Sequence, residues 1–103
     1  MSQRSAFVLR VRSDKIDDYV EAHAKVWPDM LAALRAAGIR NYSIFRAGNE
    51  VFGYFEADDL DAAGRYLDAQ DVSRRWQDHM AGLLEERVPD AGPPPLEEIF
   101  RLD

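Results

Sequence analysis

Cysteine is absent from the 103-residue chain. This absence excludes disulfide bonds, catalysis by a thiolate and any zinc site built on cysteine. A chain without cysteine fits a reducing compartment, so we expect a cytoplasmic protein. Long apolar runs are also missing. No stretch approaches the roughly 20 apolar residues of a membrane span, and the N-terminal residues lack the apolar region of a signal peptide. We therefore expect a soluble protein with no membrane partner.

Positive charge is scarce as well. The 13 Lys and Arg residues are outnumbered by 19 Asp and Glu residues, for a net charge of −6. Nucleic acid binding requires clustered basic residues, and here the basic residues alternate with acids, so a nucleic acid partner is not expected. No glycine-rich phosphate loop and no HExxH motif occurs. A metal site made of His23, His79 and an acid is conceivable, but the spacing typical of metal ligands is missing, and we expect no metal.

What is present is the composition of a globular domain, with 47% apolar and 31% charged residues. We expect one domain over residues 1–103. The apolar periodicity predicts strands and helices in the order strand, helix, strand, strand, helix, strand. We expect a strand over 5–12, a helix over 15–37 and then two strands joined at Gly48-Asn49. A second helical region is expected from Asp58-Asp59 to about Glu86, with a break near Gln70-Asp71. A loop over 90–95 and a last strand over 96–102 complete the chain. This order is the ferredoxin-like βαββαβ pattern of the α+β class.

The predicted strands carry apolar residues on both faces, as Phe7 and Val8 illustrate. Two helices cover only one face of a four-stranded sheet. A second copy of the chain, packed by a two-fold interface, is the simplest cover for the other face, so we expect a homodimer. A ligand cavity on that face is the alternative, and the two arrangements are compatible.

Three aromatic side chains recur at four-residue spacing: Tyr19, His23 and Trp27. On a continuous helix they would stack along one face. Pro28 is tolerated where it begins a new helical segment, and such a kink would frame a hollow beside His23. The alternative is a core histidine between two aromatic rings. Aromatic faces stack on sugars and histidine titrates near neutrality, so the group suits proton transfer on a neutral sugar.

Two further places carry candidate residues. Tyr42 lies in the middle of a predicted strand, and Trp76 and His79 lie on a charged predicted helix. Trp76 is either an anchor between helix and sheet or part of a site. His79 is expected to be solvated.

Several motifs recur together along nearly the whole chain. They are AFVLRV in the first strand, Y-x-x-x-H-x-x-x-W-P from Tyr19 to Pro28, N-Y-x-I-F from Asn41 to Phe45, D-V-x-x-R-W from Asp71 to Trp76, and L-E-E-I-F near the end. Their combination resembles the L-rhamnose mutarotase family. The resemblance implies a dimeric α/β-barrel fold and interconversion of the α and β anomers of L-rhamnose without a cofactor. It also implies that His23 is the proton donor and that Tyr19, Tyr42 and Trp76 contact the sugar. Trp27 is a further candidate for the wall of the sugar site.

Two positions depart from the family pattern. Trp76 is followed by Gln77 where the family has a second tryptophan, and Arg101 stands where the closing strand commonly has tyrosine. Gln77 exchanges a stacking surface for an amide, so we include it among the candidate sugar-binding residues. L-Fucose or a related 6-deoxyhexose is the alternative substrate. The competing function class is a cofactor-independent monooxygenase or haem-degrading enzyme, which shares this barrel.

Overall fold

Three strands form an antiparallel sheet in the computed structural model, which describes residues 2–86, 88 and 93–102. The strands are β1 (Gln3–Arg10), β2 (Arg40–Ala47) and β3 (Glu50–Ala57), and β3 lies in the middle. β2 and β3 form the predicted hairpin. Gly48, in its turn, has φ +61°, a left-handed conformation that a residue without Cβ adopts readily.

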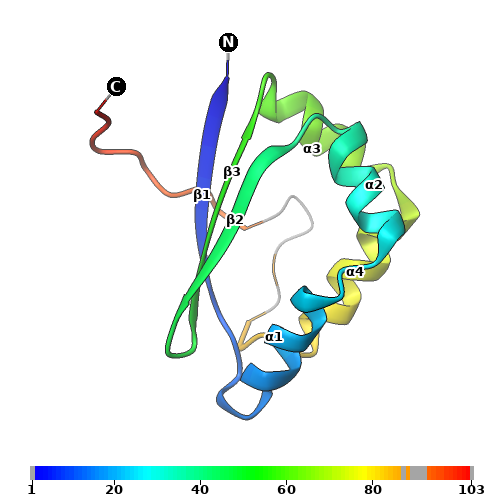
Figure 1. Ribbon diagram of the computed structural model, residues 1–103, viewed down its shortest axis with the longest axis vertical. Coiled ribbons are helices and arrows are strands. Elements are labelled where there is room, and N and C mark those ends of the chain that lie inside the picture. Colours follow the sequence, from blue (N-terminus) through cyan, green and yellow to red (C-terminus); the bar gives the residue numbers. More distant parts are fainter. Residues whose placement is uncertain (1, 87, 89–92, 103) are drawn as a thin grey trace.

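Among the residues described, four helices are formed, and they lie on one side of this sheet (Figure 1). They are α1 (Ile16–Ala24), α2 (Pro28–Ala36), α3 (Leu60–Asp68) and α4 (Asp71–Ala81), and a short 3-10 turn, η1 (Ser13–Lys15), precedes α1. Both predicted helical regions are therefore broken where breaks were expected, before Pro28 and near Gln70. Within the described residues, no helix is long and apolar enough to cross a membrane.

The core lies between the helices and the face of the sheet that they cover, here called the inner face. Val11 and Val51 are fully buried in it. The same cluster contains Tyr19 from α1 and Trp76 from α4, which are only 5% and 8% exposed. Two residues chosen from the sequence as sugar-binding candidates are therefore also packing residues, which holds their positions firmly.

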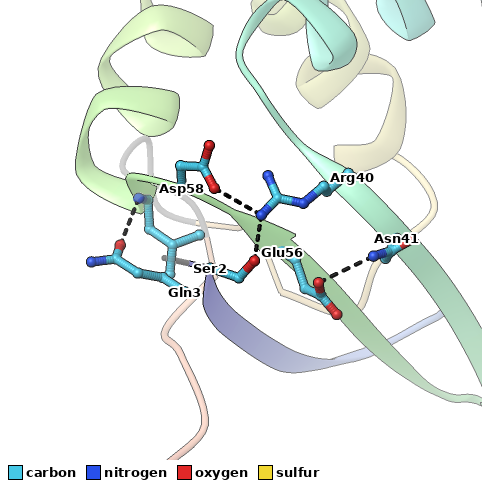
Figure 2. A network of polar contacts seen from close by, with 7 residues as sticks. Ser2, Gln3, Arg40, Asn41, Glu56 and Asp58 are labelled. Atoms are coloured by element: carbon cyan, nitrogen blue, oxygen red, sulfur yellow. Dashed lines mark hydrogen bonds and ion pairs between the residues drawn. The ribbon is translucent and has the colours of Figure 1, made fainter.

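A bulge interrupts β2 between Arg40 and Ser43. Asn41 adopts φ +52° there, a left-handed conformation in which asparagine is enriched. Figure 2 shows how polar contacts hold the bulge: the Asn41 amide donates to Glu56 at 3.1 Å, and Arg40 donates to Asp58 at 2.8 Å. These contacts tie the start of β2 to the end of β3 and fix the backbone next to Tyr42.

The predicted last strand over residues 96–102 does not form as a strand in the structure. Its place beside the free edge of β1 is filled in two pieces instead. Leu84 forms an isolated antiparallel bridge with Val11, and further on the Leu96 amide donates to the Ala6 carbonyl at 2.7 Å. The intervening prolines explain the interruption, because proline has no N–H to donate to a neighbouring strand. Of the loop predicted for residues 90–95, residues 90–92 lie outside the described residues, and residues 93–95 form no helix or strand.

Beyond Leu96 the chain stays extended, and Glu98 pairs with Arg4 of β1. The apolar side chains that follow remain open to solvent: Ile99, Phe100 and Leu102 are 89%, 77% and 85% exposed. Figure 1 shows this segment ending on the side of β1 away from the helices. A single copy of the chain therefore leaves its C-terminal apolar residues without cover.

Candidate active site

Pro28 separates two helices in the connection between β1 and β2. The aromatic residues Tyr19 and His23 lie before this break, and Trp27 lies within it. α1 ends at Ala24, and Pro28 is the first residue of α2, where its missing N–H costs no helical hydrogen bond. Trp27 occupies the N-cap position of α2 in an extended conformation. His23 is thus in the last turn of α1, and Trp27 begins the next segment.

His23 is held by the backbone of its own helix. Its Nδ1 atom lies 2.9 Å from the carbonyl oxygen of Tyr19. A carbonyl oxygen can only accept, so Nδ1 carries the hydrogen and donates it, and Nε2 is the nitrogen left to react. Burial lowers the pKa of His23 below its ordinary value, and the hydrogen bond to Tyr19 opposes that shift in part. At neutral pH the imidazole is therefore neutral, with Nε2 able to accept a proton.

Aromatic rings enclose the half-buried imidazole from two directions. The Tyr19 ring lies 4.3 Å from it, tilted by 32°, and the Trp76 ring meets it edge-on at 5.5 Å. Trp27 meets Trp76 edge-on at 5.1 Å. The expected continuous stack of Tyr19, His23 and Trp27 is thus correct for the first pair only. Because α1 stops at Ala24, Trp27 leaves the helical face and reaches the cluster through Trp76.

Tyr42 approaches from the sheet. Its ring lies on the inner face, 6.4 Å from Phe7 and 5.3 Å from Phe55. The Tyr42 residue as a whole is 40% exposed, but burial around its hydroxyl and the nearby Tyr19 hydroxyl both raise its pKa. Burial also raises the pKa of Tyr19 to about 12. Both phenols therefore keep their protons at neutral pH and can donate hydrogen bonds to a ligand.

The chain also has clear sequence relatives. A sequence model of the L-rhamnose mutarotase family matches residues 4–102. The chain belongs to the L-rhamnose mutarotase family. L-Rhamnose mutarotases from Oceanobacillus iheyensis and Shouchella clausii are 31% and 35% identical to it. The alignments cover 98% and 96% of this chain and 99% and 97% of those relatives.

Solved structures place the fold in the same family. The L-rhamnose mutarotase of Formosa agariphila matches with a TM-score of 0.79 at 28% identity, over 98% of this chain and 99% of that one. Tetracenomycin F2 cyclase from Streptomyces glaucescens matches with a TM-score of 0.69 at 20% identity, over 98% and 97% of the two chains, and shows the fold alone. The predicted α+β, ferredoxin-like fold class is confirmed. The predicted class of enzyme, a sugar mutarotase of the isomerase type, is confirmed by the family, which disfavours the monooxygenase and haem-degrading alternatives.

Both residues that depart from the family pattern are exposed to solvent. Gln77 is exposed on α4, one position after the buried Trp76. Arg101 is exposed in the C-terminal segment. His79 is exposed, as expected, yet its ring lies 5.7 Å from Trp27. No group of three or more His, Cys, Asp or Glu residues that would hold a metal ion occurs in the described part of the chain.

A hollow of about 240 Å³ opens beside Tyr42, but it is separate from His23. Its lining comes from α2, the following turn and the start of β2: Leu31, Leu34, Arg35, Ile39, Arg40, Asn41 and Tyr42. It opens to solvent, and none of its lining residues lies in α1 or α4. The candidate site is therefore defined by the aromatic residues around His23, which are Tyr19, Trp27 and Trp76, and not by this hollow.

Sequence reasoning missed the contacts that support the site from outside. Phe7 and Phe55 flank Tyr42 across strands, and the guanidinium of Arg75 lies 5.9 Å from the centre of the Trp27 ring. The alternation of β1 and β3 predicts which residues share a face but not which rings meet. For Arg75 the sequence offers two signals: its place in the D-V-x-x-R-W motif, and its four-residue spacing from Asp71, which is typical of an ion pair on a helix.

Proposed function

We propose that this protein interconverts the α and β anomers of L-rhamnose and that His23 transfers the proton. The observation that carries the proposal is the hydrogen bond between His23 Nδ1 and the Tyr19 carbonyl. It leaves Nε2 as the reactive nitrogen of a ring that contacts Tyr19 and Trp76, and the Tyr19 phenol keeps its proton. Membership of the L-rhamnose mutarotase family supports this sugar as substrate.

The reaction moves one proton and breaks one bond. Neutral His23 takes the proton of the anomeric hydroxyl at Nε2, and the bond between C1 and the ring oxygen breaks to give the open-chain aldehyde. The imidazolium then donates the same proton to the former ring oxygen. Closure after rotation about the C1–C2 bond repeats these steps in reverse and gives the other anomer. His23 thus acts first as base and then as the proton donor that the family resemblance implies.

Aromatic rings and hydroxyl groups would hold the sugar during this transfer. The half-buried Trp27 offers an apolar face for the C–H groups of the pyranose, the largely buried Trp76 borders the sugar beside it, and the hydroxyls of Tyr19 and Tyr42 donate hydrogen bonds. Gln77 is the candidate for tuning which sugar is preferred, because its amide stands where the family pattern has a second tryptophan ring. L-Fucose is the alternative substrate, and we propose that neither sugar needs a metal or organic cofactor.

We also propose a homodimer that forms through the outer face of the sheet. Val8, Phe52 and Phe45 are cross-strand neighbours in β1, β3 and β2, and they form a continuous outer apolar row. They are 36%, 40% and 67% exposed. The row spans all three strands, so a second copy of the same sheet is a self-complementary cover for it. A cytoplasmic location is proposed from the absence of cysteine.

Magnetisation transfer between anomeric protons tests the reaction. The protein is added to L-rhamnose, L-fucose and D-glucose at equal concentrations, and exchange rates are measured with and without a chelator. We expect acceleration for L-rhamnose that survives chelation and little acceleration for D-glucose. Faster exchange for L-fucose would reassign the substrate, and no acceleration for any 6-deoxyhexose would overturn the proposal.

A further inference from the structure

The position of Trp27 depends on contacts made by its side chain. The residue lies between α1 and α2, outside both helices, and no side-chain cap fixes it there. Its carbonyl accepts hydrogen bonds from Met30 and Leu31 at 2.9 and 3.0 Å, which hold the backbone but not the ring. The ring itself meets three side chains of α4, so α4 determines where it lies.

Arg75 supplies the cationic contact of these three. Its guanidinium carbon lies over the Trp27 ring, 5.9 Å from the ring centre, within the range of a cation–π interaction. Its Nε atom donates to the carboxylate of Asp71, one helical turn earlier, at 2.8 Å. That ion pair holds the planar guanidinium in one orientation, and so the cation is presented to the ring as a fixed plane.

The contacts continue from Trp27 to the reactive histidine. Trp27 meets Trp76 edge-on at 5.1 Å, and Trp76 meets His23 edge-on at 5.5 Å. Trp76 is anchored by burial in the core, whereas Trp27 is only half-buried. Arg75 therefore supports Trp27, which the core holds less firmly than Trp76.

We propose that Arg75, held by Asp71, is a positioning residue that fixes the Trp27 ring. Through that ring it also fixes the aromatic wall beside His23, which consists of Trp27 and Trp76. The inference rests on the proposed function for its effect on sugar binding. Arg75 does not touch the reacting atoms. Its loss lets the Trp27 ring move, which weakens the binding of the sugar without removing the group that transfers the proton.

Arg75→Gln tests this role, with Asp71→Asn as a second variant and Arg74→Gln as the matched control. Arg74 is the neighbouring arginine of α4, and its guanidinium donates to the Asp68 carbonyl at 3.1 Å. We expect Arg75→Gln to raise KM for L-rhamnose by about two- to fivefold, the size of one exposed cation–π contact. The value of kcat stays within about twofold, because the chemistry is untouched. Asp71→Asn shifts KM in the same direction by less, and Arg74→Gln does not shift it.

Acrylamide quenching of tryptophan fluorescence gives a second readout that needs no sugar. The chain has two tryptophans, and Trp76 is buried, so added quenching reports on Trp27. We expect more quenching in Arg75→Gln than in wild type or Arg74→Gln. Arg75→Lys should give an intermediate value, because it keeps the positive charge but loses the planar guanidinium group.

Quenching and KM that both match the Arg74→Gln control overturn the inference. Increased quenching with unchanged KM also overturns it, because the ring would then move without consequence for the sugar. If wild type accelerates exchange of no sugar, the proposed function fails. The quenching comparison, measured without sugar, then still decides whether Arg75 fixes Trp27.

Discussion

The ring of Phe7 lies directly over Gly53 on the inner face of the sheet. The two residues are cross-strand partners in β1 and β3. A Cβ atom built on Gly53 would stand 2.1 Å from Cζ of Phe7, far inside van der Waals contact. Phe7 is 5% exposed, and its ring meets Tyr42 edge-on at 6.4 Å. The absence of a side chain at position 53 therefore sets where Phe7 lies, and Phe7 in turn borders Tyr42.

Gly53→Ala should destabilise the fold, because the added methyl group displaces a buried ring. We expect a loss of about 1–3 kcal/mol in the free energy of unfolding, the usual cost of overpacking. Gly64→Ala is the matched control. Gly64 lies in α3 with nothing within 4 Å of its Cβ position, so the same change should stabilise by about 0.5–1 kcal/mol. Urea denaturation measures both, and equal shifts for the two variants would refute the close packing of Phe7 on Gly53.

The pH dependence of the reaction should follow His23. The neutral imidazole accepts the proton, so the rate rises as pH increases through the pKa of His23. Burial lowers that pKa below the ordinary value of 6.5, and the half-maximal rate should therefore lie below pH 6.5. The pKa of Tyr19 is about 12, so this phenol loses no proton in the neutral range and adds no decline there. Anomer exchange measured from pH 4.5 to about pH 8 tests the profile.

His23→Ala should lower kcat by about 10²–10⁴-fold, the usual contribution of a general acid–base group. Sugar binding should change little, since the imidazole is one polar contact among several. His79→Ala is the control, because His79 borders Trp27 from the exposed side and has no place in the proton transfer. Circular dichroism establishes that both variants fold. Wild-type exchange in His23→Ala would return His23 to the role of a core histidine.

Local signals in the sequence were enough to predict the interruptions of the helices. Pro28 excludes a continuous helix because its ring removes a hydrogen-bond donor. In the same way, Gly48 predicted the hairpin, because glycine readily adopts the left-handed conformation of its turn. The consequence of the first break was harder to foresee. Helical spacing predicted that Trp27 would lie beside His23, but the spacing rule ends where the helix ends. The position of Trp27 is set by side chains of α4, which is distant in sequence and close only after folding.

The last predicted strand shows the same limit. The alternation of residues 96–102 suits a strand, and Leu96 and Glu98 do contact β1. Strand formation also needs a partner with matching register over several residues, which is a property of the assembled sheet. For the candidate site, the residue types and motifs were readable from the sequence. The distances between the rings around His23 and the hydrogen bond that holds its Nδ1 atom were not.

Tyr42→Phe should weaken sugar binding and leave the proton transfer largely intact. It removes one hydroxyl, worth about 0.5–1.5 kcal/mol, and so KM should rise by a few-fold. Tyr54→Phe is the matched control, because its hydroxyl donates to Glu56 at 2.7 Å on the opposite face of the sheet. Steady-state exchange kinetics separate KM from kcat. Equal KM values for the two variants would remove Tyr42 from the sugar site.

Gln77→Trp should change the preference between sugars. The added ring restores the second stacking surface of the family pattern, so the rate for L-rhamnose should rise relative to that for L-fucose. Gln77→Leu serves as control, because it removes the amide without adding a ring. Exchange rates for the two sugars under identical conditions give the ratio. A ratio that stays constant across all three proteins would place position 77 outside the site.

Val8→Asp should convert the proposed dimer to a monomer. Val8 begins the outer apolar row, and in a two-fold interface each copy would bury the introduced carboxylate against Phe52 and Phe45 without a partner charge. Val20→Asp on α1 is the matched control, since Val20 is 48% exposed and lies on the helical side of the molecule. Light scattering at micromolar concentration should give a dimer for wild type and Val20→Asp and a monomer for Val8→Asp. A monomeric wild type, or a Val8→Asp protein that stays dimeric, would show that a second copy does not cover this face.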